Sequence, residues 1–195
     1  MSKVLILGAN GGIARVAIDI LLREKNTQLT LCLRNAQWLK HLESNRVRVI
    51  EGDVLNLVEL IEAMAGQDVV YANLAGQLKR MAETIVEAMS ITGLRRLVFI
   101  SSMGIYGEVP GEKYKNILDP YRDSAAVIEA SNLDYTIIRP AWFTNANEVD
   151  YETTSKGEPF KGSIVSRKSV ADLVVKLILD PNLEVRQSLG VNKPE

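Results

Sequence analysis

The sequence predicts an α/β protein, in which one doubly wound parallel sheet of about six to seven strands has helices on both faces. Short apolar runs alternate with stretches of helical periodicity along the chain, as in repeated strand–helix–strand units. The first apolar run leads into a glycine-rich turn and then a helical pattern. Polar residues directly follow most of the apolar runs, as expected where parallel strands end at one edge of a sheet.

The first strand is predicted at residues 4–7, where four consecutive apolar residues suit a strand buried on both faces. A glycine-rich turn, Gly8 to Arg15, follows it and merges into a helical pattern. The unpaired N–H groups and the positive end of this helix would face an anion, so a phosphate group is expected here. Gly8 would allow the tight turn, Gly11 or Gly12 the close approach of the phosphate, and Ala14 the packing of the helix on the strand.

The remaining elements follow from periodicity and stop signals. Further strands are predicted at residues 29–33, 47–50, 68–71, 97–100 and 135–138, with short ones at 164–165 and 189–191. Helices are predicted from the first turn to near Lys25–Asn26, then around residues 57–64, 81–92, 121–128 and 170–178. The segment 141–161 is polar and without clear periodicity, so a loop is expected there, and it and the long loop 102–116 are candidate lids.

Composition limits the class of protein. The 195 residues suit a single domain, 1–195, and a formal net charge of −1 without a basic face gives no reason to expect a nucleic-acid partner. Cys32 and His41 are the only cysteine and the only histidine, so neither an intrachain disulfide nor a Cys/His metal site is expected. No signal-peptide pattern or membrane-length apolar run is present, so we expect a cytoplasmic protein without a membrane partner.

Six of the predicted strands are each followed by a glycine or a polar residue. These residues are Gly8, Arg34, Asp53, Asn73, the pair Ser101–Ser102 and the pair Arg139–Pro140. Because ligands of doubly wound sheets bind beyond the carboxyl ends of the strands, all of them are expected to line one ligand-binding edge.

Four motifs, in the same order along the chain, resemble those of the short-chain dehydrogenase/reductase superfamily, in its atypical, NmrA-like or NAD(P)H-binding branch. Residues 8–14, Gly-Ala-Asn-Gly-Gly-Ile-Ala, fit the glycine motif, and residues 73–76, Asn-Leu-Ala-Gly, are similar to the Asn-Asn-Ala-Gly turn. Residues 101–107 resemble a Ser-Ser-x-x-x-Tyr-Gly segment, and residues 133–140 are close to Leu-Asp-Tyr-Thr-Ile-Ile-Arg-Pro. The resemblance covers essentially the whole chain and implies a Rossmann fold that binds NAD(P).

The resemblance also implies which residues bind the cofactor. They are Gly8, Asn10, Gly11, Gly12, Ile13, Ala14, Arg15, Arg34, Asp53, Val54, Asn73, Leu74, Ala75, Gly76, Ser101, Pro140, Ala141, Trp142 and Phe143. Asp53 would accept a hydrogen bond from the adenine amino group, although it could also be the N-cap of the next helix. Pro140 would shape the loop beside the nicotinamide, although a proline that simply ends a strand is the alternative.

The cofactor is expected to be NADP(H) rather than NAD(H). The acidic residue that selects NAD at the tip of the second strand is absent, and Arg34 stands there, followed by Asn35. An arginine can pair with the 2′-phosphate of NADP, and Arg15 could reach the same phosphate. A plain surface arginine is the alternative for Arg34.

The catalytic pair of the superfamily, a tyrosine with a lysine four residues later, is missing. Ser101 or Ser102 fits the family's catalytic serine, and Tyr106 is a further catalytic candidate, but no Tyr-x-x-x-Lys occurs. The resemblance therefore favours a reductase that needs only hydride delivery to a flavin, a quinone or a small carbonyl acceptor. Tyr106, Trp142 and Phe143 would form an apolar floor for that acceptor, or would be ordinary packing.

The alternative function is a non-catalytic redox sensor that binds NADP(H) and acts through a protein partner. Sugar-nucleotide epimerase chemistry is less expected, because it uses the missing Tyr–Lys pair. A homo-oligomer is possible, and no metal is expected.

The segment 165–172 is similar to the start of the family's last helix. Ser166 is expected to be its N-cap, and Asp172 to add negative charge near its positive end. Its role is interpreted as structural.

Overall fold

The structure, a computed structural model, describes residues 1–195 and shows one large mixed sheet and one small sheet. The strands of the large sheet are β1 (Ser2–Leu7), β2 (Thr27–Leu33), β3 (Val47–Glu51), β4 (Val69–Ala72), β5 (Arg96–Ile100), β6 (Asp134–Pro140), β8 (Glu152–Ser155) and β10 (Gln187–Asn192). Their spatial order is β3-β2-β1-β4-β5-β6-β10-β8. The expectation of six to seven strands is wrong, since this sheet has eight.

Seven of these strands run parallel, and only the edge strand β8 pairs antiparallel, with β10. The order reverses between β1 and β4, because the chain first builds the β2–β3 side and then returns to add β4 next to β1. This reversal is the topological switch point at which doubly wound sheets bind ligands.

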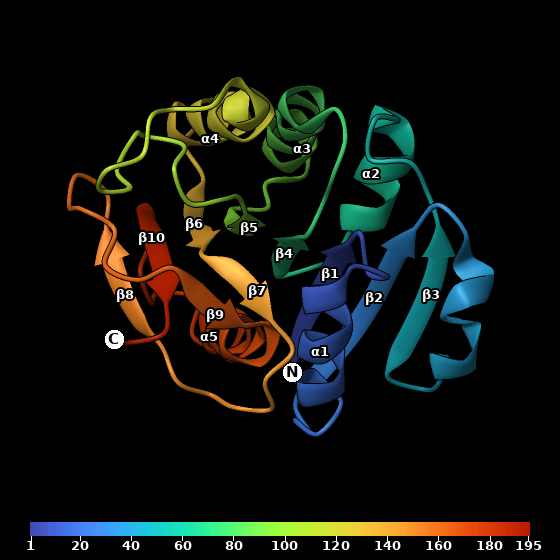
Figure 1. Ribbon diagram of the computed structural model, residues 1–195. Helices are drawn as coiled ribbons and strands as arrows, with labels where there is room; N and C mark the ends of the chain where they lie inside the picture. The colour runs from blue at the N-terminus through green and yellow to red at the C-terminus, as the bar shows by residue number, and fades with distance from the viewer.

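Helices cover both faces of the sheet, in three layers (Figure 1). α1 (Gly12–Leu21) and α5 (Arg167–Leu179) pack side by side on one face. α2 (Leu57–Met64), α3 (Leu78–Thr92) and α4 (Asp119–Glu129) lie in a row on the other face. The predicted α/β architecture with helices on both faces is confirmed.

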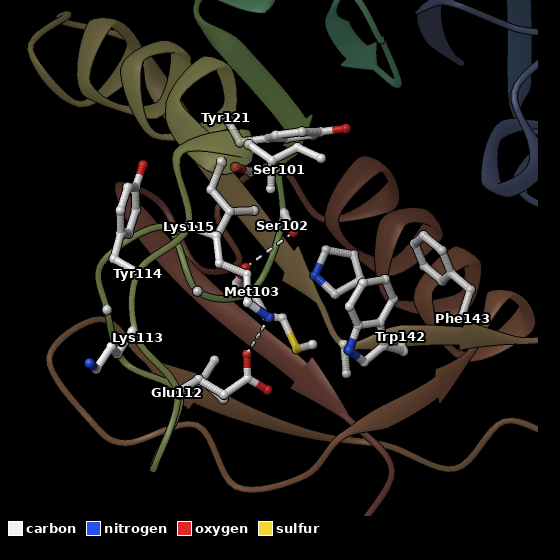
Figure 2. A pocket seen from close by; sticks show the side chains of 17 residues that line it. Ser101, Ser102, Met103, Glu112, Lys113, Tyr114, Lys115, Tyr121, Trp142 and Phe143 are labelled. Atoms are coloured by element: carbon white, nitrogen blue, oxygen red, sulfur yellow. Dashed lines mark hydrogen bonds and ion pairs between the residues drawn. The ribbon is translucent and has the colours of Figure 1, made fainter.

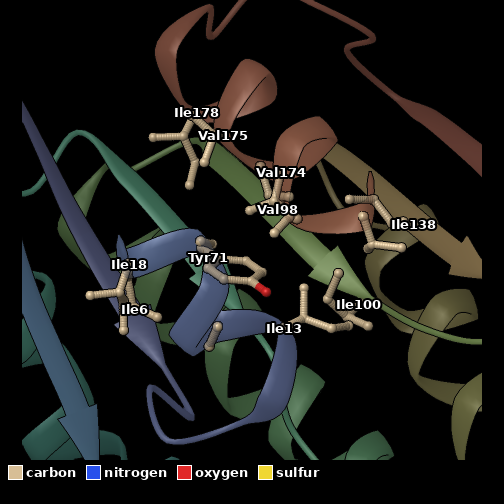
Figure 3. Close-up of a cluster of buried hydrophobic side chains, with 14 of the residues drawn as sticks. Ile6, Ile13, Ile18, Tyr71, Val98, Ile100, Ile138, Val174, Val175 and Ile178 are labelled. Atoms are coloured by element: carbon tan, nitrogen blue, oxygen red, sulfur yellow. The ribbon is translucent and has the colours of Figure 1, made fainter. Parts of the chain in front are cut away.

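The sheet separates two hydrophobic cores. In β1, Val4 and Ile6 belong to the core under α1 and α5, whereas Leu5 and Leu7 belong to the core under α2, α3 and α4. This explains why the predicted strand is an unbroken apolar run. Figure 3 shows Tyr71 of β4 inside the first core, where its hydroxyl is buried without a hydrogen-bond partner.

The predicted C-terminal ends of the helices are confirmed, with the exception of α1. Gly93 ends α3 in the left-handed conformation, and Gly66 has a positive φ just after α2. α1, however, ends at Leu21 rather than near Lys25–Asn26. The hydroxyl of Thr27 donates to the carbonyls of Leu21 and Glu24, so the helix ends and the chain turns toward β2 before the predicted position.

The expectation of a loop from 141 to 161 is wrong for part of that segment. β7 (Trp142–Thr144) pairs in parallel with β9 (Ile164–Ser166) as a separate two-stranded sheet, and β8 extends the main sheet. β7 and β8 are both short, and β8 is polar, so neither shows the alternation of apolar and polar residues that would predict a strand from the sequence. Three single turns of 3-10 helix, at residues 36–38, 40–42 and 116–118, complete the structure.

None of the helices has both the length and the apolar character that crossing a membrane requires.

Candidate functional site

The glycine-rich turn lies between β1 and α1, at the switch point of the sheet. Gly8 has a φ of +73°, its N–H donates to the Cys32 carbonyl at 3.0 Å, and a Cβ added to it would lie 2.1 Å from the Asn73 carbonyl oxygen. The turn from β1 is therefore held between the ends of β2 and β4, at a distance that only glycine permits.

Gly11 and Gly12 have different roles. A Cβ on Gly11 would lie 2.1 Å from the Asn73 side-chain nitrogen, so this glycine makes room for Asn73. Gly12 instead faces the side chain of Arg167, and the α1 N-terminus has neither a side-chain cap nor an acidic residue in its first turn. The first amides of α1 are thus free of protein acceptors, as a pyrophosphate-binding turn requires.

The other residues expected in this turn have mixed exposure. Asn10 is half-buried and Arg15 is exposed, whereas Ile13 and Ala14 are buried against the core. Ala14 lies fully inside the first core, consistent with the small residue that the strand–helix contact needs.

Asp53 follows β3 and is exposed at the predicted edge, with Val54 buried beside it. One carboxylate oxygen of Asp53 accepts from the Leu55 N–H at 3.0 Å. The N-cap of α2 is Asn56, whose side chain accepts from the Glu59 N–H, so the interpretation of Asp53 as the N-cap is wrong.

The turn after β4 reaches the same edge. Asn73 donates its backbone N–H to Leu7, Leu74 is half-buried, and Ala75 and Gly76 are exposed. The ends of β1, β2, β3 and β4 therefore present the predicted cofactor residues along one continuous edge.

A pocket of about 290 Å³ opens beyond the carboxyl ends of β5 and β6. Its lining includes Ser101, Ser102, Tyr114, Tyr121, Pro140, Ala141, Trp142 and Phe143. Figure 2 shows Tyr114 and Tyr121 across the pocket from Trp142 and Phe143, with the two serines between them. This volume lies near the lower end of the range for small-molecule sites.

The two serines differ in what their hydroxyls do. The Ser102 hydroxyl donates to the Met103 carbonyl at 3.1 Å. Ser101 is 5% exposed, and its hydroxyl has no hydrogen-bond partner in the protein. Because buried polar groups are rarely left unpaired, an unpaired hydroxyl on a pocket wall fits a ligand oxygen.

Tyr106 is not part of the pocket lining. Its hydroxyl donates to Glu129 at 2.6 Å and contacts Ser188 at 3.1 Å, and its ring lies against the cations of Arg139 and Lys156. Burial, and then the hydrogen bond to Glu129, raise the pKa of Tyr106. These contacts make it a structural residue next to the site, so it does not form the expected acceptor floor with Trp142 and Phe143.

Arg139 was expected on the ligand-binding edge with Pro140, but its side chain is fully buried. It pairs with Glu108, and its other N–H groups donate to Ser188 and to the carbonyls of Thr154 and Ser188. Pro140 does line the pocket.

Sequence reasoning missed two residues of this region. Tyr121 begins the helix predicted at 121–128 and was given no role in the site, yet it lies on the pocket wall. Ala125 stands one turn later, so no lysine lies beside Tyr121 at helical spacing. Arg167 was assigned a structural role, yet its side chain lies against Gly12. The signal for Arg167 was a cation at the start of a helix, where positive charge is unfavourable.

Comparison with known proteins agrees with this geometry. Residues 8–181 match the family described as NAD(P)H-binding. The chain belongs to this NAD(P)H-binding family. The glycine turn, the switch point and the pocket beyond β5 and β6 lie within the matched residues.

Solved structures agree over almost the whole length. A Rossmann-fold NAD(P)-binding family protein from Shigella flexneri is 43% identical, with a TM-score of 0.87 over 100% of this chain and 94% of that one. A short-chain dehydrogenase/reductase from Veillonella parvula in complex with NADP is 30% identical, with a TM-score of 0.90 over 99% and 95% of the chains. The resemblance of this NAD(P)H-binding family member to short-chain dehydrogenases/reductases is confirmed.

A more distant relative carries a different name. YhfK of Bacillus subtilis (strain 168), named an uncharacterized sugar epimerase, is 25% identical over 94% of this chain and 91% of its own length.

Proposed function

We propose that the protein is an NADP(H)-dependent reductase of an apolar, planar acceptor, such as a flavin or a quinone, or of a small carbonyl compound. The observation that carries this proposal is the pocket beyond β5 and β6, where aromatic side chains surround a buried, unpaired Ser101 hydroxyl. The pocket adjoins Pro140, beside which the family resemblance puts the nicotinamide.

The residues present fit a nicotinamide dinucleotide. That cofactor supplies a hydride when it is bound. The uncapped start of α1 would hold its pyrophosphate, Asp53 would accept a hydrogen bond from its adenine, and Asn73 to Gly76 would border it along the sheet edge. Ser101 donates its hydroxyl proton to a ligand carbonyl oxygen at the pocket wall and thereby orients that ligand.

The missing tyrosine–lysine pair favours an acceptor that needs little acid–base catalysis, although Glu112, Lys113 and Lys115 also line the pocket. Tyr121 has Ala125 rather than a lysine one turn later, and the Tyr106 hydroxyl is bonded to Glu129 outside the pocket. A flavin or quinone can take its proton from water. Catalysis then depends mainly on holding the acceptor ring against the nicotinamide ring. Trp142, 67% exposed at the pocket mouth, offers a flat apolar surface for such a ring.

The preference for NADP(H) is part of the proposal. Arg34 and Arg15 are both exposed at the switch-point edge, and neither forms an ion pair. The nearby carboxylate of Glu51 accepts from the Ala36 N–H. Two unpaired arginines suit a 2′-phosphate, and the Veillonella relative was solved with NADP.

Steady-state kinetics with NADPH and a panel of flavins, quinones and small aldehydes test the function. We expect sustained oxidation of NADPH at more than about one turnover per second with at least one acceptor. Ser101→Ala is expected to lower turnover, with Ser102→Ala as the matched control because that hydroxyl is bonded within the protein. Tight NADPH binding without turnover would instead support the redox-sensor function.

Equilibrium titration with NADPH and NADH tests the cofactor preference separately. We expect NADPH to bind at least about tenfold more tightly, which corresponds to roughly 1.4 kcal/mol. Arg34→Ala is expected to remove most of that difference without changing the affinity for NADH. Equal dissociation constants for the two cofactors in the unmodified protein would refute the preference.

A further inference from the structure

We propose that Arg167, the first residue of α5, binds the cofactor pyrophosphate from the side opposite the glycine-rich turn. This inference rests on the dinucleotide site of the proposed function and adds a ligand from the far end of the chain. It assigns a binding role to a residue whose segment was interpreted as purely structural from the sequence.

The fold brings Arg167 to the glycine-rich turn. α1 and α5 lie side by side on one face of the sheet (Figure 1), and both begin at its carboxyl edge. Ser166 caps α5 by accepting from the Ser169 N–H at 2.9 Å and donating to the Glu148 carbonyl at 2.7 Å, which fixes where the helix starts. A Cβ on Gly12 would lie 3.2 Å from Arg167 Nε, so the guanidinium stands over the first turn of α1.

Positive charge accumulates there without a counter-ion. Neither α1 nor α5 has an acidic residue in its first turn. Arg167 Nη1 donates to Asn145 Oδ1 at 2.6 Å, and Lys168 Nζ donates to Asn147 Oδ1 at 2.9 Å, so both cations have neutral partners. Neither lies within 4.0 Å of a carboxylate.

A bound anion would reduce the electrostatic repulsion between these positive groups. Two helix N-termini and a guanidinium each repel one another's positive charge, and each is stabilised by a phosphate placed between them. The chain belongs to a family described as NAD(P)H-binding, and the proposed function puts the cofactor pyrophosphate at this turn, so the pyrophosphate is the anion that these charges would meet.

The guanidinium is held in an orientation suited to phosphate. Its plane is constrained by the Phe143 ring, whose centroid is 5.1 Å from Cζ, and by the bond to Asn145. These contacts leave N–H groups for the two-pronged hydrogen bonding that arginine makes to phosphate oxygens. Phe143 also lines the acceptor pocket, so one side chain contacts both the pyrophosphate side and the pocket wall.

Isothermal titration of NADPH and of ADP-ribose into the full chain tests the inference. ADP-ribose carries the pyrophosphate but no nicotinamide, so it separates the phosphate contact from effects on the pocket. Arg167→Ala is expected to weaken both ligands by about 10- to 100-fold, the range for a charge-assisted contact. Lys168→Ala removes the same charge one residue away and is expected to change either affinity by less than about threefold.

Arg167→Lys separates charge from geometry. We expect it to bind both ligands with affinities between those of the unmodified protein and Arg167→Ala, because lysine keeps the charge but lacks the planar fork. Thermal unfolding of each variant checks that α5 is intact.

Three results would overturn the inference. They are equal losses in Arg167→Ala and Lys168→Ala, a loss confined to NADPH with ADP-ribose unchanged, and unchanged binding of both ligands in Arg167→Ala. Absence of NADPH binding in the unmodified protein would instead refute the proposed function itself, which keeps the two failures distinguishable.

Discussion

Gly8 is a residue at which backbone conformation and close packing coincide. Its φ is +73°, and a Cβ would lie 2.1 Å from the Asn73 carbonyl oxygen. Gly66 has almost the same φ, +72°, but no atom lies within 4 Å of where its Cβ would be. The two glycines therefore separate the cost of the left-handed conformation from the cost of steric contact.

Alanine at each position tests this separation. Gly66→Ala is expected to lower the free energy of unfolding by about 1–2 kcal/mol, the cost of a left-handed non-glycine residue. Gly8→Ala is expected to lower it by about 2–5 kcal/mol, since overpacking against rigid backbone adds to that cost. Urea denaturation followed by circular dichroism measures both, and equal losses would show that the contact with Asn73 relaxes freely.

Cys32 is the last residue but one of β2, and its side chain is buried. Burial, and then the carboxylates of Glu59 and Asp53, raise its pKa to about 11. The unfolded chain, with an ordinary thiol pKa, loses this proton at lower pH than the folded protein does. The contribution of Cys32 to stability is therefore fully present below the unfolded pKa and is lost as pH rises toward 11.

Cys32→Ala is expected to show the effect of this titration on stability. Between pH 8 and pH 10.5 the unmodified protein should lose up to roughly 2–3 kcal/mol more unfolding free energy than the variant does. Urea unfolding at several pH values measures the difference. Parallel pH profiles for the two proteins would mean that the thiol does not hold its proton in the folded state.

At residue scale the sequence could name candidates but could not choose between neighbours. It predicted Ser101 and Ser102 together, and only the structure shows that the hydroxyl of Ser101 is the unpaired one. It left open whether Gly11 or Gly12 allows the close approach of the phosphate, and the structure shows that Gly11 makes room for the Asn73 amide. Both distinctions depend on contacts between residues far apart in the chain, which no local pattern contains.

At the scale of elements, β1, β4 and β5 were found because buried parallel strands are continuous apolar runs, whereas the edge strand β3, Val-Arg-Val-Ile-Glu, is mostly not buried and was found from its apolar residues alone. β7 and β8 were missed because they are short. β8, Glu-Thr-Thr-Ser, is an edge strand that is held by its backbone pairing with β10 rather than by burial of apolar side chains. Local composition cannot show a pairing that a distant strand provides.

The start of α5 was predicted well, and it can be tested against another helix start. Ser166 is 1% exposed and bonds to both the Ser169 N–H and the Glu148 carbonyl, whereas Asn56 caps α2 from an exposed position. Both caps satisfy helix amides, but only the loss of Ser166 leaves buried polar groups unpaired.

Ser166→Ala is therefore expected to cost about 2–3 kcal/mol of unfolding free energy, and Asn56→Ala about 1 kcal/mol or less. Thermal and urea unfolding of the two variants provide the comparison. The same Ser166 variant should weaken NADPH binding, because α5 carries Arg167. A larger loss in Asn56→Ala would contradict the assignment of the Ser166 network.

At the scale of the whole molecule, one buried ion pair connects the pocket loop to the far half of the sheet. Arg139 of β6 is 0% exposed and bonds to β8 and β10, while Glu108, in the loop after β5, accepts from the N–H groups of Gly104 and Tyr106. This pair could not be predicted from the sequence, because Arg139 follows an apolar run and so looks like a polar residue just beyond a strand end.

Substituting only one member of this ion pair should lower the free energy of unfolding strongly. Glu108→Gln keeps an acceptor for the loop amides but leaves the Arg139 cation buried without a counter-charge, so it is expected to cost about 3–5 kcal/mol of unfolding free energy. Arg139→Met is expected to cost a similar amount, because it leaves the Glu108 carboxylate and the Thr154 and Ser188 carbonyls unpaired.

The double variant decides whether the pair acts as a unit. Glu108→Gln combined with Arg139→Met removes both charges, so its cost should fall short of the sum of the single costs by at least about 1 kcal/mol. Urea denaturation of the four proteins completes this double-mutant cycle. Additive costs would mean that the two side chains stabilise the loop and the sheet independently, and the pocket wall after β5 would then owe its position to local turns alone.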